Sequence, residues 1–314
     1  MSDRKPMRVV FGETLVELGA EDERIVVLDA DVSSSTQTKL FAAACPDRFF
    51  NFGVAEANMV SAAAGFAACG MVPFVSTFAL FVSLRAGDQV RSQIAYTGLN
   101  VKLVGGYAGL SDYADGASHQ SVEDIAVLRA IPNFAILSPS DRGQTKQAVR
   151  AAAAHDGPVF LRISRQPVGE LHPADTPFEI GKSLQLRDGS DVALIAAGPV
   201  LESVLAAAER LADEGVQARV IDMHTIKPLD CEAVVRAASE TGALVTVEEH
   251  NVFGGLGSAV CEAVCAAHPV PVRRVGIPDR FGESGEYSEI LERAGLSPGS
   301  IAAAARQAIQ AKAG

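Results

Sequence analysis

The residue best placed to do chemistry is Glu56, a carboxylate at the head of an apolar, Ala- and Gly-rich segment that runs to Gly70. The only other charged residue before Asp88 is Arg85, so we expect Glu56 to be poorly solvated. A buried carboxyl has a raised pKa and can share a proton with a ring nitrogen. The alternative is that Glu56 only caps the helix that follows, because acidic side chains stabilise helix N-termini.

A loop rich in hydroxyl groups, residues 29–36, follows the apolar run 25–28 and includes Asp31 and Ser35. In open α/β sheets, ligand-binding residues gather in loops beyond the carboxyl ends of the strands. The hydroxyls and amides of this loop could bind a phosphate, and a plain helix cap is the alternative.

A second polar loop, residues 107–120, follows the apolar run 101–104 and reads YAGLSDYADGASHQ. It combines Tyr107, Asp115 and His119. A His whose pKa lies near neutrality is the usual proton carrier in catalysis. A lone loop His is more often a solvated side chain, and the nearby Asp115 brings the functional interpretation level with that alternative.

Two arginines are candidates for binding an anionic substrate group. Arg165 follows the apolar run 159–163, and its planar fork of donors suits a phosphate. Arg8 could serve in the same way. For both residues a surface salt bridge is the alternative.

Phe78 and Phe81 stand three residues apart in the stretch 77–81, so they would share one face if this stretch is helical. Two such rings could bind a planar heterocycle between them, but packing in a core is the default explanation. The glycines of 254–257 lack the full spacing of a dinucleotide-binding loop, so we assign them no nucleotide role.

Short apolar runs alternate with Ala-rich helical stretches along the first half of the chain. This alternation predicts an α/β fold with a mostly parallel, doubly wound sheet. The expected strands are 25–28, 101–104, 134–137 and 159–163, and the expected helices are about 57–69, 122–130 and 141–154.

A second α/β unit begins near residue 191, after a polar stretch interrupted by prolines. We therefore expect two doubly wound domains, 1–170 and 191–314, joined by a linker over 171–190. The second unit is expected to contain strands at 191–198, 218–221 and 243–247 and a helix at about 200–214.

Composition limits the possible classes of protein. The net charge of −11 argues against a nucleic-acid partner, because phosphate binding needs a basic surface. No apolar run reaches the roughly 20 residues that span a bilayer, and residues 1–8 lack the apolar core of a signal peptide. We therefore expect a cytoplasmic protein without a membrane partner. The five scattered cysteines suggest reduced, buried thiols, not disulfides or a zinc site.

Several motifs, in order, resemble the C-terminal half of transketolase from about Arg8 to the end of the chain. NFGVAEANM resembles the pyrimidine-domain motif with its glutamate, STFALF its aromatic segment and DGASHQ its substrate loop. IDMHTIKPLD, VTVEEHNVFGGLGSAV and GIPDRFGESG resemble the last domain. Single-chain transketolases are about twice this length, so the chain is similar to the second subunit of a split enzyme.

The resemblance implies transfer of a two-carbon ketol unit from a ketose to an aldose with thiamine diphosphate as cofactor. Glu56 would hydrogen-bond the aminopyrimidine ring, Phe78 and Phe81 would pack on it, and Asp31 would lie near the thiazolium. His119 would also act in catalysis by moving protons. The substrate-binding residues that it implies are Arg8, Ser35, Tyr107, Asp115, His119 and Arg165.

The family's Gly-Asp-Gly motif, which binds the diphosphate and Mg²⁺, does not occur in this sequence. The resemblance therefore implies no metal ligand in this chain and an obligate N-terminal transketolase subunit that carries the motif. A heterotetramer with two copies of each subunit is the expected assembly, acting on sugar phosphates.

The sequence departs from the family at two positions. Many transketolases have a His at the position of Tyr107 and a Tyr at that of Leu84, so we expect the sugar to differ from the usual pentose phosphates. The alternatives are the beta subunit of a 2-oxo acid dehydrogenase, a deoxyxylulose-phosphate synthase, which is a single longer chain, and a non-catalytic regulatory subunit of the same fold.

Overall fold

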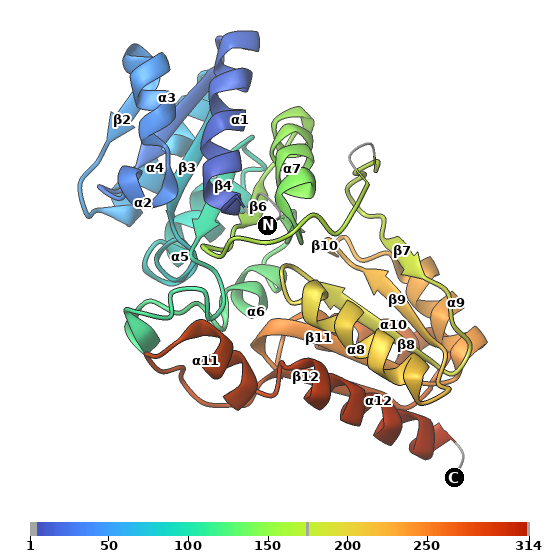
Figure 1. The fold of residues 1–314 in the computed structure, drawn as a ribbon. Coiled ribbons are helices and arrows are strands. Elements are labelled where there is room, and N and C mark those ends of the chain that lie inside the picture. The colour runs from blue at the N-terminus through green and yellow to red at the C-terminus, as the bar shows by residue number, and fades with distance from the viewer. Residues whose placement is uncertain (1–4, 174–175, 313–314) are drawn as a thin grey trace.

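The chain forms two lobes, each built on one β-sheet flanked by helices (Figure 1). The computed structural model describes residues 5–173 and 176–312. The first lobe holds a seven-stranded sheet and the second a five-stranded sheet, and within both most neighbouring strands are parallel. This architecture confirms the expected pair of doubly wound units.

The first sheet has the strand order β10-β5-β6-β4-β3-β1-β2. Its central strands are buried along their whole length, as expected where helices cover both faces of a parallel sheet. The strands are β1 (Ile25–Asp29), β2 (Phe49–Asn51), β3 (Val72–Phe78), β4 (Lys102–Gly106), β5 (Ala135–Leu137), β6 (Val159–Arg162) and β10 (Thr225–Lys227).

The second sheet has the order β12-β11-β8-β9-β7. The antiparallel edge strand β7 lies inside the stretch expected as a linker, so 171–190 is in part a structural element of the second lobe. The strands are β7 (Leu184–Arg187), β8 (Val192–Ala197), β9 (Ala218–Asp222), β11 (Leu244–Asn251) and β12 (Val272–Ile277).

One strand of the first sheet comes from the second half of the chain. β10 comes from the second half of the chain but pairs antiparallel with β5 of the first sheet. This strand is only three residues long, and its sequence has no pattern that predicts a strand. The pairing ties the second half of the chain to the edge of the first sheet.

Helices cover both faces of each sheet (Figure 1). In the first lobe they are α1 (Met7–Glu21), α2 (Ser33–Thr36), α3 (Lys39–Ala44), α4 (Glu56–Ala68), α5 (Gly87–Gln89), α6 (Asp124–Arg129) and α7 (Arg142–Ala154). In the second lobe they are α8 (Leu201–Asp213), α9 (Cys231–Thr241), α10 (Leu256–Ala267), α11 (Tyr287–Arg293) and α12 (Pro298–Lys312). Short π-helical turns cover Phe81–Arg85 and Val90–Ala95, and 3-10 turns cover Pro46–Arg48 and Gly116–Ser118.

The five cysteines are free, but the expectation that they are buried is wrong. Three are exposed and two are half-buried, because they lie at helix ends or on outward faces. Over the described residues, no helix has both the length and the apolar character needed to cross a membrane.

Candidate active site at the carboxyl end of the first sheet

Glu56 is the first residue of α4, and its side chain is only 5% exposed. Its Oε1 accepts a hydrogen bond from Arg85 Nη1 at 3.1 Å. The Arg85 guanidinium in turn stacks 3.9 Å from the centroid of the Phe81 ring. One arginine therefore connects the buried carboxylate to the aromatic residues that the sequence singled out.

Phe78, Phe81 and Tyr107 form one buried aromatic cluster. The Phe78 centroid lies 5.7 Å from that of Phe81 and 4.5 Å from that of Tyr107. The expectation of a shared helix face is wrong, because Phe78 ends β3 and Phe81 begins the π-helical turn. The strand-to-helix turn brings the two rings together instead.

His119 lies against this cluster. Its ring meets Phe78 and Phe81 edge-on, with centroids 5.9 and 5.3 Å apart. Its Nδ1 is 2.9 Å from Ser118 Oγ, within the 3-10 turn that closes the loop after β4. The imidazole is half-buried, so it can exchange protons with a molecule bound at the aromatic cluster.

Arg8 and Arg165 flank Tyr107 from two different parts of the chain. Arg8, on α1, donates from Nη1 to Ser35 O at 2.9 Å and to the Tyr107 hydroxyl at 3.2 Å. Arg165, just after β6, places its guanidinium 5.1 Å from the Tyr107 centroid. The two guanidinium groups make this end of the site suitable for an anion.

Asp29 holds the hydroxyl-rich loop after β1 in place. It is fully buried and accepts hydrogen bonds from Val32 N at 2.7 Å, Thr38 Oγ1 at 2.7 Å and Thr36 Oγ1 at 3.2 Å. Burial raises its pKa. Asp31 itself is exposed, with a φ of 65°, and accepts from Asn51 Nδ2 at 2.9 Å.

Asp112 was not among the candidates from sequence, although it lies within the loop 107–120. It is buried, and its Oδ1 accepts from Arg165 Nη1 at 3.2 Å. Burial, reinforced by the neighbouring Asp115 carboxylate, raises the pKa of Asp112 to about 6. Asp115 is exposed and precedes the 3-10 turn. Asp112 is buried only because distant parts of the chain pack around it, so the sequence of this polar loop could not identify it as a site residue.

The second lobe anchors the loop 107–120. Glu249, near the end of β11, accepts from Leu110 N at 3.2 Å and from the Tyr287 hydroxyl at 2.6 Å. Burial raises the pKa of Glu249. Gln120 Nε2 donates to the carbonyl oxygen of Glu283 at 3.0 Å, on the loop before α11.

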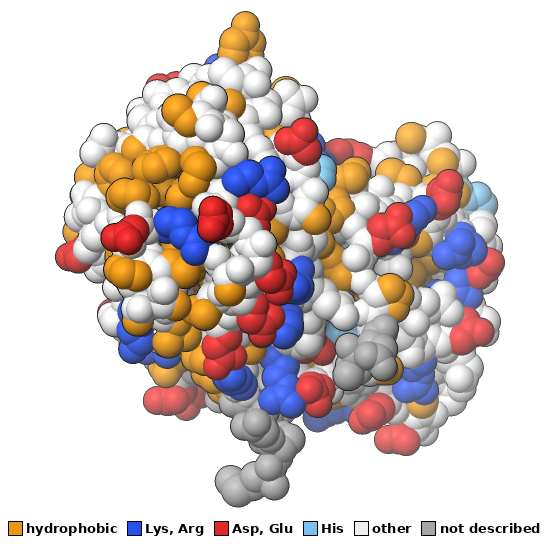
Figure 2. Space-filling model, turned by 90° about the horizontal axis from the view of Figure 1, so that it is seen from above, with side chains coloured by type: hydrophobic (Ala, Val, Ile, Leu, Met, Phe, Trp, Pro, Cys, Tyr) orange, Lys and Arg blue, Asp and Glu red, His pale blue; other side chains and the backbone are white. Residues whose placement is uncertain are grey.

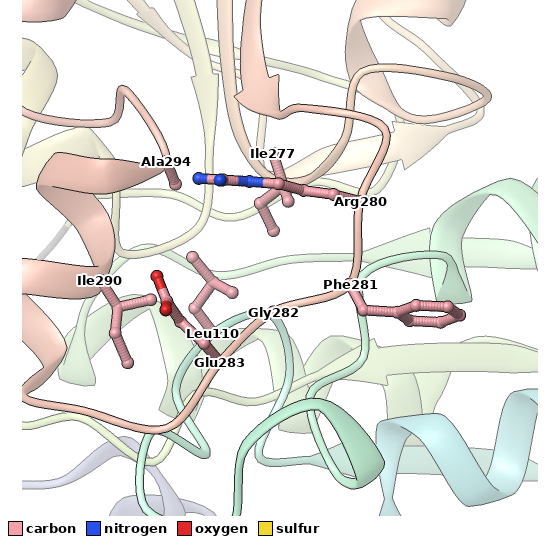
Figure 3. Close-up of a pocket in the computed structure, with 8 residues that line it drawn as sticks. All are labelled: Leu110, Ile277, Arg280, Phe281, Gly282, Glu283, Ile290 and Ala294. Atoms are coloured by element: carbon pink, nitrogen blue, oxygen red, sulfur yellow. The ribbon is translucent and has the colours of Figure 1, made fainter.

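A small cavity of about 120 Å³ lies between this loop and the segment before α11 (Figure 3). Arg280 and Glu283 point toward the cavity, whereas the Phe281 ring points away. Ligand pockets usually enclose about 300–1,000 Å³, so this cavity is too small for a sugar phosphate. It separates two packed loops and lies apart from the aromatic cluster.

A carboxylate lies at the glycine-containing turn 254–257 before α10. Glu248 accepts from Leu256 N at 2.7 Å and Gly257 N at 2.8 Å, so a carboxylate occupies the N-terminus of α10 where a phosphate would bind a dinucleotide loop. The described residues hold no group of three His, Cys, Asp or Glu side chains placed to bind a metal ion. Acidic and basic side chains are interspersed on the face in Figure 2, without a continuous basic surface.

Two family models match the chain, the transketolase pyrimidine-binding domain over residues 3–170 and the transketolase C-terminal domain over 181–301. A 6-deoxy-6-sulfo-D-fructose transketolase subunit of a Clostridium species is 42% identical over 98% of this chain and 95% of its own. A putative transketolase C-terminal section of Methanocaldococcus jannaschii is 45% identical over 95% of this chain and 94% of its own.

Solved structures of transketolases are also similar to this chain. One described as a split gene transketolase, inactive beta4 tetramer, is 45% identical, covers 98% of this chain and 99% of its own, and superposes with a TM-score of 0.90. A transketolase from Leishmania mexicana shares the fold with a TM-score of 0.81, and the match covers 45% of its length. The chain belongs to the transketolase family and corresponds to the C-terminal subunit of its split members.

Proposed function

We propose that this chain is one subunit of a two-subunit, thiamine-diphosphate-dependent transketolase that moves a two-carbon ketol unit from a ketose to an aldose. The observation that carries the proposal is the position of Glu56, a buried carboxylate joined through Arg85 to the Phe81 ring. A carboxylate beside aromatic faces is the set of groups that an aminopyrimidine ring needs.

The residues present fit the pyrimidine end of this cofactor. Phe78 and Phe81 offer ring faces to a planar heterocycle, and Glu56 offers an acceptor to a ring N–H. When bound, thiamine diphosphate supplies the electron sink for carbon–carbon bond cleavage. Glu56 would hold a proton at the pyrimidine nitrogen, and the aromatic cluster would exclude water from that contact.

His119 and Asp115 would act on the substrate side. His119 touches both phenylalanine rings and is half-buried, so it can give or take a proton at a substrate hydroxyl. Asp115, exposed on the same loop, would accept a hydrogen bond from another hydroxyl, and Asp31 would line the cofactor on the opposite side.

Arg8, Ser35 and Arg165 would bind the far end of the substrate. Arg8 already contacts the Ser35 carbonyl, and both arginines lie on Tyr107. The relatives' names mention a sulfonated sugar and, for a subunit from Phocaeicola vulgatus 41% identical to this chain, apulose 4-phosphate. Both substrates carry an anionic terminal group, which two guanidinium groups would recognise.

An N-terminal partner subunit would supply the diphosphate and Mg²⁺ site and complete a heterotetramer. Exposed apolar side chains gather near Glu56, with Val54 72% and Leu84 47% exposed. Such side chains suit a surface that a second subunit covers. The relative described as an inactive beta4 tetramer supports the expectation that this type of subunit needs a different partner for activity.

Isothermal titration of thiamine diphosphate with Mg²⁺ tests the proposal. We expect tight binding to the complex of this chain with its N-terminal partner and weak binding to this chain alone. Ketol transfer should then follow in the complex with a suitable ketose and aldose. Tight cofactor binding and full activity of this chain alone would contradict the shared site, and no binding to the complex would contradict the assignment as an enzyme.

A further inference from the structure

Arg165 is not free at the anionic end of the site, because the fold pairs it with Asp112. Arg165 Nη1 donates to Asp112 Oδ1 at 3.2 Å, and the Asp112 side chain is fully buried while that of Arg165 is 29% exposed. Arg165 N also donates to Ser111 Oγ at 3.2 Å, and Gly116 N donates to Asp112 O at 3.1 Å. These backbone contacts fix the ion pair at the base of the loop.

In the part of the chain that the structure describes, no carboxylate forms an ion pair with the neighbouring guanidinium, that of Arg8. Among the described residues, the hydrogen bonds of Arg8 go to Ser35 O and the Tyr107 hydroxyl, which are both uncharged. Tyr107 is itself buried and separates Arg8 from Arg165. Two positive charges and one buried negative charge would therefore face an anionic group bound at this end of the site.

Resting on the proposed function, we infer that Asp112 is a specificity-determining residue that disfavours doubly charged phosphate relative to terminal groups with one negative charge or none. A phosphate that approached Arg165 would come within a few ångströms of the Asp112 carboxylate. Two like charges at such a short distance in a partly buried site repel each other strongly, because little water screens them. A hydroxyl or a sulfonate meets less repulsion and still finds the donors of Arg8.

The charged groups that face Asp112 define its pH dependence. Burial and the Asp115 carboxylate raise its pKa, whereas Arg165 and His119 oppose this effect, and the result is about 6. Among the described residues, none donates a hydrogen bond to the buried Asp112 Oδ2, so this oxygen can accept a proton. Below pH 6 a neutral Asp112 leaves the charge of Arg165 available, and dianions should bind more tightly.

Inorganic sulfate is a suitable probe, because it stays a dianion between pH 5 and 8 while a phosphate ester titrates near pH 6. We would titrate sulfate into the two-subunit complex at pH 7.5 and pH 5. At pH 7.5 we expect D112N to bind sulfate roughly tenfold more tightly than wild type. The matched control is E283Q, which removes one carboxylate from the adjacent loop and should leave sulfate affinity unchanged.

The pH dependence of sulfate affinity tests whether Asp112 is the group that titrates. Wild-type affinity should rise toward pH 5, and this rise should shrink in D112N but persist in H119Q, in which Asp112 is intact. H119Q therefore still tests the inference if D112N fails to fold. Equal sulfate affinity in wild type and D112N at pH 7.5, or loss of the pH dependence in H119Q alone, would overturn the role of Asp112.

Activity gives a second readout. The ratio of kcat/KM for an aldose phosphate to that for the same unphosphorylated aldose should rise roughly tenfold in D112N and stay constant in E283Q. If the wild-type complex transfers no ketol unit, the proposed function fails while the sulfate titration still decides the role of Asp112. If transfer occurs but the ratio is unchanged in D112N, the function stands and the inference on Asp112 fails.

Discussion

Arg85 donates from Nη1 to Glu56 Oε1 at 3.1 Å, although 52% of the Arg85 side chain is exposed and only 5% of Glu56 is. The nearly buried carboxylate thus pairs with a cation that is itself half exposed to solvent. A side chain on the surface loses its partner more easily than a buried one, so a bound heterocycle could take over the Glu56 contact. Arg85 is therefore a positioning residue for Glu56.

The first prediction concerns Glu56. E56Q keeps the size of the side chain but removes the carboxylate that would hold a proton on the cofactor. We expect ketol transfer by the two-subunit complex to fall by at least 100-fold, since general acid–base groups contribute about 10²–10⁴-fold. Steady-state kinetics of the complex would measure this loss.

The matched control is E17Q, which removes an exposed carboxylate paired with Lys146 on the outer face of the first lobe. We expect its activity to match wild type. An E56Q complex with activity within threefold of wild type would assign Glu56 a structural role as a helix cap.

The second prediction concerns Tyr107. Its hydroxyl accepts from Arg8 Nη1 at 3.2 Å, so the ring takes up one donor of the anion site. Y107H introduces a smaller side chain that can carry a positive charge, and we expect it to raise kcat/KM for aldose phosphates relative to unphosphorylated aldoses. Y107F removes only the hydroxyl and serves as the comparison. An unchanged acceptor profile in Y107H would show that this residue does not determine the substrate.

The third prediction concerns a junction between the lobes. His172 Nδ1 lies 2.8 Å from Asp141 Oδ2, and its Nε2 makes an ion-pair contact at 3.0 Å with Asp222 Oδ2. Asp141 caps α7 in the first lobe, and Asp222 ends β9 in the second. Although burial opposes the charge, the hydrogen bonds and charges of the two carboxylates raise the pKa of His172 to about 9.

A raised folded-state pKa stabilises the protein fully below the unfolded value of about 6.5, and this contribution is lost as the pH rises through 9. We expect H172Q to lower the free energy of unfolding by up to about 3 kcal/mol at pH 6.5, and this gap should narrow as the pH rises from 6.5 to 9 and almost vanish above pH 9. Urea unfolding of both proteins at pH 6.5, 8 and 9.5 would measure it. Lys102, whose pKa burial lowers to about 7, has the opposite slope and cancels in the difference between the two proteins. A gap that does not change with pH would contradict the charged His172.

The sequence was most informative where a local pattern sets local structure. The apolar runs predicted β1, β4 and β6 and the loops that follow them, because parallel strands send their carboxyl ends to one edge. Spacing alone could not reveal that Phe78 ends a strand or that Asp112 is buried, because both depend on how distant elements pack. β10 shows the same limit, since only pairing with β5 makes three residues a strand.

The last prediction concerns Tyr287, which ties the second lobe to the loop 107–120 through Glu249. Its hydroxyl donates to Glu249 Oε1 at 2.6 Å, while Glu249 Oε2 accepts from Leu110 N at 3.2 Å. Y287F deprives a buried carboxylate of one donor, which costs about 1–3 kcal/mol and lowers the Tm. Because Leu110 belongs to the loop that carries Asp115 and His119, we also expect a higher KM for the sugars with a smaller change in kcat. Thermal unfolding and steady-state kinetics of the complex would measure both effects.

Y96F changes a tyrosine that is 85% exposed and should alter neither the Tm nor the KM. A Y287F variant with a lower Tm but an unchanged KM would show that the contact stabilises the second lobe without positioning the loop.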